Sequence, residues 1–469
     1  MDLYDVAAEV LQKFNKKQGS VKNLVFSSNY KNVRQLYALV CESLKYQEVM
    51  STIFDKCSGL LEDKTLTRNR ELAIVLLYEH LVGKGLRHAG SLKRICIMRH
   101  KKEVKEACSQ LMQEQGVDSL ASLLSGQSQM FNNLPIPRYV RVNLLKTTVD
   151  DVKATFEDEG WIWHGQLTLN NFRAEVEGLC DDKFALDPLM PDLLVFPPAT
   201  ELHAHHLTNN GSIVLQDRAS CFPAHVLNPP SGATVLDCCA APGNKTSHIA
   251  SLLGNSGRVL AYERDVKRMS LLQKQLQKTG VTNTTTKCQD FLSVDPHDPS
   301  FANVEFILVD PSCSGSGMLS RMDHLSSTTC QRLENLARFQ VSILKHALRF
   351  SSVRRVVYST CSINEEENEQ VVAEVAWQVK DQFHVQKIFP MWPHRGQGSS
   401  PYADCCIRMS PKDDLTNGFF VACFEKTEKS ATLCQEASAK KLKKRKQRRK
   451  DGMNENMHKK KKLSDDTVG

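Results

Sequence analysis

The sequence predicts an α/β protein in which a helical region precedes a mostly parallel sheet. From residue 211 onward short apolar strands alternate with helical patterns, which is typical of a parallel sheet covered by helices. The first 130 residues contain no proline and place apolar residues at spacings of three and four, which is typical of packed helices. The chain has 469 residues, 41% of them hydrophobic and 24% charged, which suits a soluble protein with two or three buried cores.

The composition also excludes several classes of protein. No run of 18 apolar residues occurs, so the sequence predicts no membrane span. The first five residues are not a basic segment followed by an apolar one, so we expect no secretory signal. The 16 cysteines are scattered without a C-x-x-C pair. This pattern favours reduced intracellular thiols over a disulfide framework or a zinc cluster, and we expect no metal site.

Residues 1–125 are predicted to form a helical N-terminal domain. Apolar residues crowd the segment 71–82, as expected for a well-buried helix. The segment 87–105 is rich in basic side chains, namely Arg87, His88, Lys93, Arg94, Arg99, His100, Lys101, Lys102 and Lys105. Such a segment is either an ordinary solvated helix face or a local patch that contacts phosphate groups, and both interpretations stay open.

Two α/β regions are predicted to follow. Residues 126–210 form a small α/β module, with strands at 139–143 and 193–196 and a helix at 148–159. Residues 211–428 form the larger domain, with strands at 235–237, 258–262, 285–289, 306–309, 355–358 and 419–424 and helices at 245–253, 266–278 and 331–350. Open parallel sheets bind their ligands beyond the carboxyl ends of the strands, so we expect the functional site there.

The net charge of +8 belongs to the C-terminal tail. Residues 440–469 contain 13 Lys and Arg against 4 Asp and Glu, which leaves a balance of −1 for the rest of the chain. A segment of like charge with few apolar residues cannot build a core, so residues 429–469 are predicted to be a disordered basic tail. Two clusters of lysine and arginine favour nuclear or nucleolar targeting and weak RNA binding, although a solvated tail without a specific role is the alternative.

The first strand of the larger domain leads into a loop suited to a ligand. Small residues follow Asp237, and a helix begins after Gly243, so backbone N–H groups and the positive end of the helix meet there. Glu263 stands 20 residues after Gly243 at the end of the second strand, where an acid can accept hydrogen bonds from ribose hydroxyls. Asp290 and Asp310 end the next two strands. Any one of these acids alone is an ordinary turn or cap residue, but all four together favour a nucleoside-like, positively charged cofactor such as S-adenosylmethionine.

Three segments resemble the signature segments of the Nop/Sun family of RNA cytosine-5 methyltransferases. They are Asp237-Cys-Cys-Ala-Ala-Pro-Gly-Asn-Lys-Thr246, Asp310-Pro-Ser-Cys-Ser-Gly-Ser-Gly317 and Tyr358-Ser-Thr-Cys-Ser362. The segments 211–220 and 418–422 are similar to flanking segments of the family, so the resemblance covers about 138–424. The Pro-Ser-Cys wording and the segment 392–396 point to the fifth branch, which methylates a cytosine in large-subunit ribosomal RNA.

The resemblance implies a fold and a set of cofactor contacts. It implies a Rossmann-like S-adenosylmethionine-dependent methyltransferase domain at 211–428 and an RNA-recognition role for the module at 126–210. It further implies that the first segment and three strand-end acids contact the cofactor, namely Cys239, Ala240, Ala241, Pro242, Gly243, Asn244, Lys245, Glu263, Asp290 and Asp310. Asn244 stands where the family loop usually has glycine, and the preceding Gly243 allows the tight turn to survive.

Two cysteines suit the chemistry that the resemblance implies. Cytosine C5 is a poor nucleophile until a thiolate adds to C6, and cysteine is strongly nucleophilic even when a few per cent is ionised. Cys313 and Cys361 follow strands that we expect to be neighbours, but residue chemistry alone does not assign their roles. By resemblance, Cys361 is the nucleophile and Cys313 assists release of the product. Asp310 is expected to hold the N3 side of the base or the amino group of the cofactor.

The target base must leave its stack to meet both thiolate and methyl donor, so we expect a loop or a flipped-out nucleotide. Candidate RNA contacts, each of which is otherwise ordinary surface charge, are Arg138, Arg141, Asn143, Lys146, Gln216 and Arg218. The expected partner is ribosomal RNA or a pre-60S particle, and the expected enzyme is a nuclear and nucleolar monomer without membrane contact. The alternatives are the same chemistry on transfer RNA, a non-catalytic ribosome-assembly factor and, remotely, a nicotinamide-dependent oxidoreductase.

Overall fold

The computed structural model describes residues 2–16, 18–19, 21–124, 136–318 and 330–427. The predicted disordered tail at 429–469 lies outside the described residues. The chain divides into two compact units, of which the first comprises residues 1–136, 314–333 and 410–418 and the second the remainder. Among the described helices, no segment has the length and apolar character needed to cross a bilayer.

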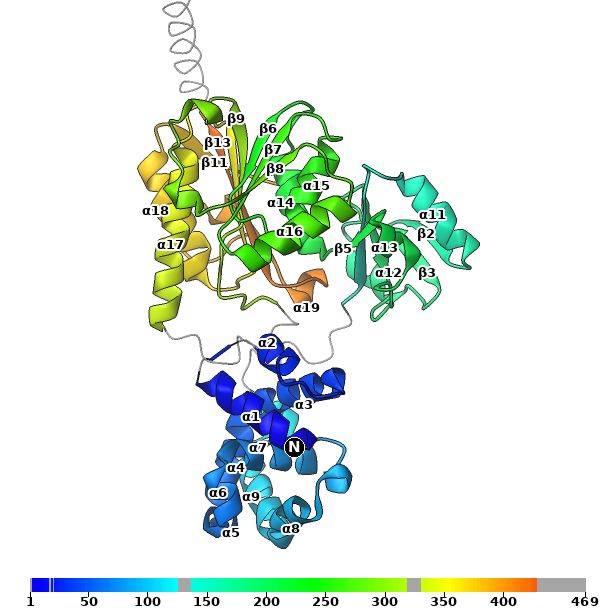
Figure 1. Cartoon of the computed structure of the whole chain (residues 1–469), viewed down its shortest axis with the longest axis vertical. Coiled ribbons are helices and arrows are strands. Elements are labelled where there is room, and N and C mark those ends of the chain that lie inside the picture. The colour runs from blue at the N-terminus through cyan, green and yellow to red at the C-terminus, as the bar shows by residue number, and fades with distance from the viewer. Residues whose placement is uncertain (1, 17, 20, 125–135, 319–329, 428–469) are drawn as a thin grey trace, which may run out of the picture. The chain divides into compact units, whose positions relative to one another are not determined.

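The N-terminal part of the first unit is helical, as predicted (Figure 1). Its central helix is α7, whose side chains from Leu72 to Tyr78 are all buried. This burial on every face explains the nearly continuous apolar run in the sequence. The helices are α1 (Leu3–Asn15), α2 (Val21–Phe26), α3 (Val33–Lys45), α4 (Gln47–Lys56), α5 (Ser58–Glu62), α6 (Lys64–Arg68), α7 (Arg70–Leu81), α8 (Ser91–Arg99) and α9 (Lys101–Glu114).

The second unit begins with a five-stranded sheet of order β2-β3-β4-β1-β5. Phe156, Phe184 and Phe196 pack together within its core, where the rings of Phe184 and Phe196 are stacked. The sheet reaches Leu215, because β5 pairs with β1. Its elements are β1 (Arg138–Val142), α11 (Val149–Asp158), β2 (Ile162–Gln166), α12 (Phe172–Glu177), β3 (Lys183–Leu186), β4 (Leu193–Phe196), α13 (His206–Asn210) and β5 (Ile213–Leu215).

The larger sheet has the order β11-β13-β10-β9-β6-β7-β8, with β12 paired to β13. The five strands from β10 to β8 are parallel, which confirms the predicted sheet, and β13 runs antiparallel between β10 and β11. These strands are β6 (Thr234–Asp237), β7 (Arg258–Glu263), β8 (Thr284–Cys288), β9 (Val304–Val309), β10 (Arg355–Thr360), β11 (Phe383–Gln386), β12 (Ile407–Met409) and β13 (Phe419–Lys426).

Helices cover both faces of this sheet (Figure 1). Three of them, α14 (Arg218–Leu227), α15 (Asn244–Leu252) and α16 (Val266–Lys278), lie on one face. Two others, α17 (Cys330–Leu348) and α18 (Glu369–Val379), lie on the opposite face. A short helix, α19 (Pro411–Asp414), belongs to the first unit. The parallel strands therefore end at one common edge, and the predicted site residues lie at or just after the ends of β6, β7, β8, β9 and β10.

Candidate active site

The loop after β6 turns sharply into α15. Gly243 has φ of 109°, a left-handed conformation that side chains with a Cβ rarely adopt, and a Cβ there would lie 3.0 Å from Leu272 Cδ1. Asn244 is the first helical residue, and its Oδ1 accepts a hydrogen bond from Gln275 Nε2 at 3.1 Å. The turn therefore depends on Gly243. Asn244 fits as the first residue of α15, although the family usually has glycine there.

Asp237 braces this loop from inside the protein. Its Oδ2 accepts a hydrogen bond from Thr246 Oγ1 at 2.7 Å, and its Oδ1 accepts one from the backbone N–H of Cys239 at 3.4 Å. Complete burial raises the pKa of Asp237 to about 7, against the opposing effect of the Thr246 hydroxyl. Asp237 is thus a buried internal support of the loop, unlike the exposed strand-end acid Asp290.

Glu263 is the strand-end acid that best suits a sugar diol. Its Oε1 accepts the backbone N–H of Asp265 at 2.9 Å. Its Oε2 is buried and receives no hydrogen bond from the described chain, although Arg268 Nη1 lies 3.3 Å away. Asp290 lies beyond the end of β8, where it caps the next turn through Leu292 N–H, and its side chain is 43% exposed. An unfilled acceptor at Glu263 beside the tight loop fits the ribose of S-adenosylmethionine.

Lys245 and Asp310 form an ion pair at the centre of the edge. Lys245 Nζ donates to Asp310 Oδ2 at 2.9 Å, and Ser359 Oγ donates to Asp310 Oδ1 at 2.7 Å. Burial lowers the pKa of Lys245, but Asp310 and then Cys361 oppose this effect and leave the pKa above its usual value. The carboxylate of Asp310, which follows β9, therefore links Lys245 at the start of α15 to Ser359 of β10.

The two predicted cysteines meet at this edge. β9 and β10 are parallel neighbours, and Cys313 Sγ lies 3.2 Å from Cys361 Sγ. The hydrogen bond between the sulfurs, together with burial, raises the pKa of the Cys313 thiol well above its usual range. The two thiols therefore share one hydrogen bond, in which either sulfur can be the donor.

The loop that carries Cys361 is held by buried polar side chains that the sequence analysis did not identify. Thr360 Oγ1 donates to Asn368 Oδ1 at 2.5 Å, and Asn368 Nδ2 donates to the carbonyl oxygen of Ser362 at 2.9 Å. Glu367 and Gln340 continue this network toward the loop of Cys313. Gln340 carries no local sequence pattern, since its partners Ser312 and Glu367 are distant in the chain.

Four of the predicted RNA contacts are wrong because their side chains are buried. They are Arg141, Asn143, Gln216 and Arg218. Arg141 Nε donates to Gln216 Oε1 at 2.9 Å, and its Nη2 donates to Ser247 Oγ at 3.0 Å. Arg218 Nε donates to Asp187 Oδ2 at 2.6 Å. The presence of a charged residue in a sequence does not show whether its side chain is buried. Here the buried Arg141 connects the smaller sheet to α15.

Comparison with known proteins gives three family matches along the chain. Residues 34–124 match the N-terminal domain and residues 136–216 the ferredoxin-like domain of NOL1/NOP2/Sun domain family member 5. Residues 224–425 match the 16S rRNA methyltransferase RsmB/F model.

Relatives resemble the chain over most of its length. A mouse "28S rRNA (cytosine-C(5))-methyltransferase" is 43% identical over 97% of this chain and 99% of its own. The Schizosaccharomyces pombe "25S rRNA (cytosine-C(5))-methyltransferase rcm1" is 39% identical over 90% of this chain and 91% of its own. A crystal structure of a methyltransferase homolog from Pyrococcus horikoshii shares the fold, with 22% identity and a TM-score of 0.50 over 80% of this chain and 99% of that one.

Proposed function

The chain belongs to the NOL1/NOP2/Sun domain family, in the branch of member 5, and from this premise we propose that it forms 5-methylcytosine in large-subunit ribosomal RNA. The observation that carries the proposal is the 43% identity to the mouse enzyme over nearly the whole of both chains. The pair of cysteine sulfurs 3.2 Å apart supports the same chemistry. The relatives that support a ribosomal target are named for 28S and 25S rRNA, which favours ribosomal over transfer RNA.

Cys361 is the proposed nucleophile. Its thiolate adds to C6 of the cytosine, which makes an S–C6 bond and turns C5 into a nucleophilic enamine carbon. The thiolate is assigned to Cys361 by the resemblance to the family, and the Lys245 ammonium is a cation near it. S-adenosylmethionine, when bound, supplies the electrophilic methyl group.

In product release the Cys313 thiolate takes the C5 proton, the C5–H electron pair re-forms the C5=C6 double bond, and the S–C6 bond breaks with its electron pair returning to Cys361. Cys313 assists this step from its position beside the departing sulfur. Asp310 keeps Lys245 oriented and offers its remaining lone pairs to the N3 side of the base or to the amino group of the cofactor.

The proposed cofactor contacts are those of the tight loop and the strand-end acids. The loop from Cys239 to Lys245 brings backbone N–H groups and the N-terminus of α15 to the ligand, and Glu263 accepts the ribose hydroxyls through its unfilled oxygen. Asp290 contributes at the exposed rim. We retain the division into domains at 1–125, 126–210, 211–428 and 429–469 as part of this proposal.

The decisive experiment incubates the full chain with methyl-labelled S-adenosylmethionine and ribosomal RNA, followed by bisulfite sequencing. We expect label on one cytosine of the large-subunit RNA with the native chain and none with Cys361→Ser. Cys313→Ala should accumulate a denaturation-stable protein–RNA adduct, because attack remains and release is lost. Cys180→Ser, at an exposed cysteine, is the matched control and should behave as the native chain. Label on transfer RNA alone, or full activity of Cys361→Ser, would refute the proposal.

The cellular setting is also proposed. The lysine and arginine clusters at 440–450 and 459–462 suit nucleolar delivery and attraction to RNA, and the substrate is then a pre-60S particle or its RNA. The enzyme acts as a monomer. A non-catalytic assembly factor does not require two cysteines in contact. Normal assembly of large ribosomal subunits with the Cys361→Ser variant would therefore favour that role.

A further inference from the structure

We infer that Gln340 and Glu367 form a positioning pair that fixes the distance between the two cysteine sulfurs. The inference rests on the proposed function, because it concerns the cysteines to which methylation is assigned. Both side chains are completely buried. Gln340 lies in α17, and Glu367 ends the short turn that precedes α18.

Gln340 links the loop of one cysteine to Glu367. Its Nε2 donates to the carbonyl oxygen of Ser312 at 3.1 Å and to Glu367 Oε1 at 3.0 Å. Ser312 directly precedes Cys313 in the chain. A single amide group therefore holds the backbone next to Cys313 and the carboxylate of Glu367 at a fixed separation.

Glu367 completes the link to the other cysteine. Its Oε2 accepts hydrogen bonds from Ser362 Oγ at 2.5 Å and from Asn364 Nδ2 at 3.2 Å. Ser362 directly follows Cys361. The two sulfurs are thus connected through buried hydrogen bonds as well as through the sheet.

The orientation of the Gln340 amide is determined by its partners. A carbonyl oxygen and a carboxylate oxygen both accept hydrogen bonds, so the NH₂ group must face them. The Oε1 atom is left buried without a hydrogen bond in the described part of the chain. A buried acceptor without a partner costs stability. Retaining it here indicates a role for Gln340 other than stability, since native structures break such rules mainly at functional sites.

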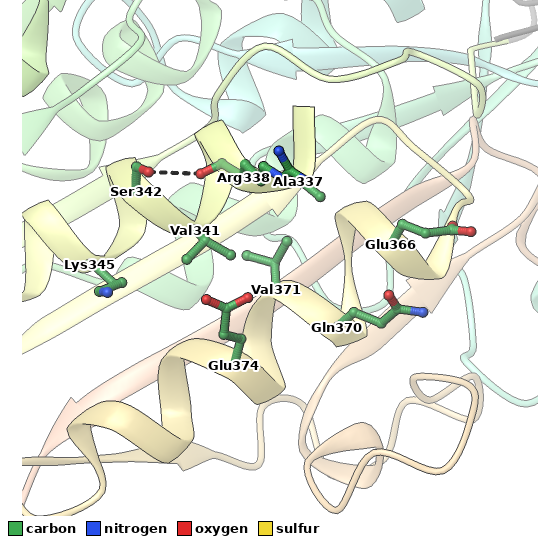
Figure 2. Close-up of a pocket in the computed structure, with 9 residues that line it drawn as sticks. All are labelled: Ala337, Arg338, Val341, Ser342, Lys345, Glu366, Gln370, Val371 and Glu374. Carbon is green, nitrogen blue, oxygen red and sulfur yellow. Dashed lines mark hydrogen bonds between the residues drawn. The ribbon is translucent and has the colours of Figure 1, made fainter. Parts of the chain in front are cut away.

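Packing between α17 and α18 does not by itself fix this region. A cavity of about 330 Å³ opens between the two helices, lined by residues on either side of Gln340 and Glu367 in the sequence. Figure 2 shows Val341 of α17 next to Val371 of α18, with charged side chains around them. Val341 and Val371 both belong to the buried core, so the hydrogen bonds of Gln340 and Glu367 act together with this apolar contact where α17 meets the turn before α18.

The test measures the proximity of the sulfurs without RNA. Diamide oxidises the full chain: Cys313 and Cys361 lose two protons and two electrons to form a disulfide, and the N=N bond of diamide takes them up. Mass spectrometry of the joined peptides gives the rate. We expect Gln340→Leu to slow this cross-link at least about tenfold, because a displacement of about 1 Å strongly affects reacting groups. Gln378→Leu, at an exposed position of α18, is the matched control and should keep the native rate.

A second measurement links proximity to turnover. With ribosomal RNA and S-adenosylmethionine, Gln340→Leu should raise the steady-state fraction of protein–RNA adduct at least about threefold while KM for the cofactor stays within about twofold. Native cross-linking in Gln340→Leu, or slower cross-linking with native adduct levels, would overturn the inference. If Gln340→Leu does not fold by circular dichroism, Gln340→Asn, which is one methylene shorter, provides the same comparison. If Gln340→Leu slows the cross-link but the native chain itself methylates no RNA, the positioning role of Gln340 stands and the proposed function is refuted.

Discussion

Replacement of Asp237 by asparagine should make the protein more stable at alkaline pH, with a smaller gain at pH 5. Burial, the largest effect on this group, raises the pKa of Asp237 from 3.8 to about 7. Between about pH 4 and 7 the folded chain therefore holds a proton that the unfolded chain has lost, and stability falls as pH rises through this window. Above pH 7 the folded protein contains a buried, ionised carboxylate, and the loss of folding stability has reached its full value.

The size of the effect follows from the same values. A pKa of about 7 against an ordinary 3.8 corresponds to at most about 4 kcal/mol of lost stability above pH 7. Asparagine never ionises. Its amide oxygen can accept from the Cys239 N–H while its NH₂ group donates to Thr246 Oγ1, whose own proton then goes to the carbonyl oxygen of Ala240 at 3.3 Å. For a domain of about 200 residues we expect a melting temperature up to about 10 °C above that of the native chain at pH 8.5.

The assay is thermal unfolding of the full chain by circular dichroism from pH 5 to pH 8.5. The difference in melting temperature between Asp237→Asn and the native chain should grow from about a third of its full value at pH 5 to its full value above pH 7. Asp381→Asn changes an exposed carboxyl and serves as the control, with no pH-dependent difference. A difference that stays constant with pH would show that ionisation of Asp237 does not limit stability.

Three further predictions concern other parts of the chain. Lys245→Met removes the cation beside Asp310 and Cys361, so single-turnover methyl transfer should fall about 100-fold while RNA affinity by filter binding stays native. Arg141→Met leaves Gln216 Oε1 and Ser247 without a donor, so urea unfolding should show a loss of about 2 kcal/mol and equilibrium dialysis weaker cofactor binding; loss of RNA affinity alone would contradict the buried role. Replacing Arg94 and Arg99 together by serine removes two exposed cations of α8. If these residues form a phosphate patch, the slope of log affinity for RNA against log salt concentration should fall by about one for each phosphate that is no longer neutralised. An unchanged slope would favour a solvated helix face.

The sequence predicted the central strands because they are buried and follow one another at regular intervals between helices. Strands β6, β7, β9 and β10 begin and end within about two residues of the predicted ranges. Strand β11 was not predicted, because its four residues alternate between buried and exposed and resemble a loop boundary. Strand β12 has only three residues. Short edge strands are stabilised by their neighbours, and local pattern does not reveal them.

The site was predictable where its residues lie in short continuous segments. Cys313 and Cys361 were found through such segments, and their contact follows from the parallel pairing of β9 and β10. Gln340 was not found, because its hydrogen bonds to Ser312 and Glu367 form only when these residues approach it in the folded chain. Arg141 was interpreted as a surface cation for the same reason, since nothing in its neighbourhood indicates that β1 turns it inward.

The position of β13 has a consequence for the order of folding. This strand comes late in the chain but pairs with β10, the strand that leads to Cys361, on one side and with β11 on the other. Until residues 419–426 have been synthesised, β10 exposes an unpaired edge that is prone to non-native association. Cys361, the proposed nucleophile, therefore reaches its final setting at a late step of synthesis, and a fragment that ends before Phe419 should aggregate rather than retain partial activity.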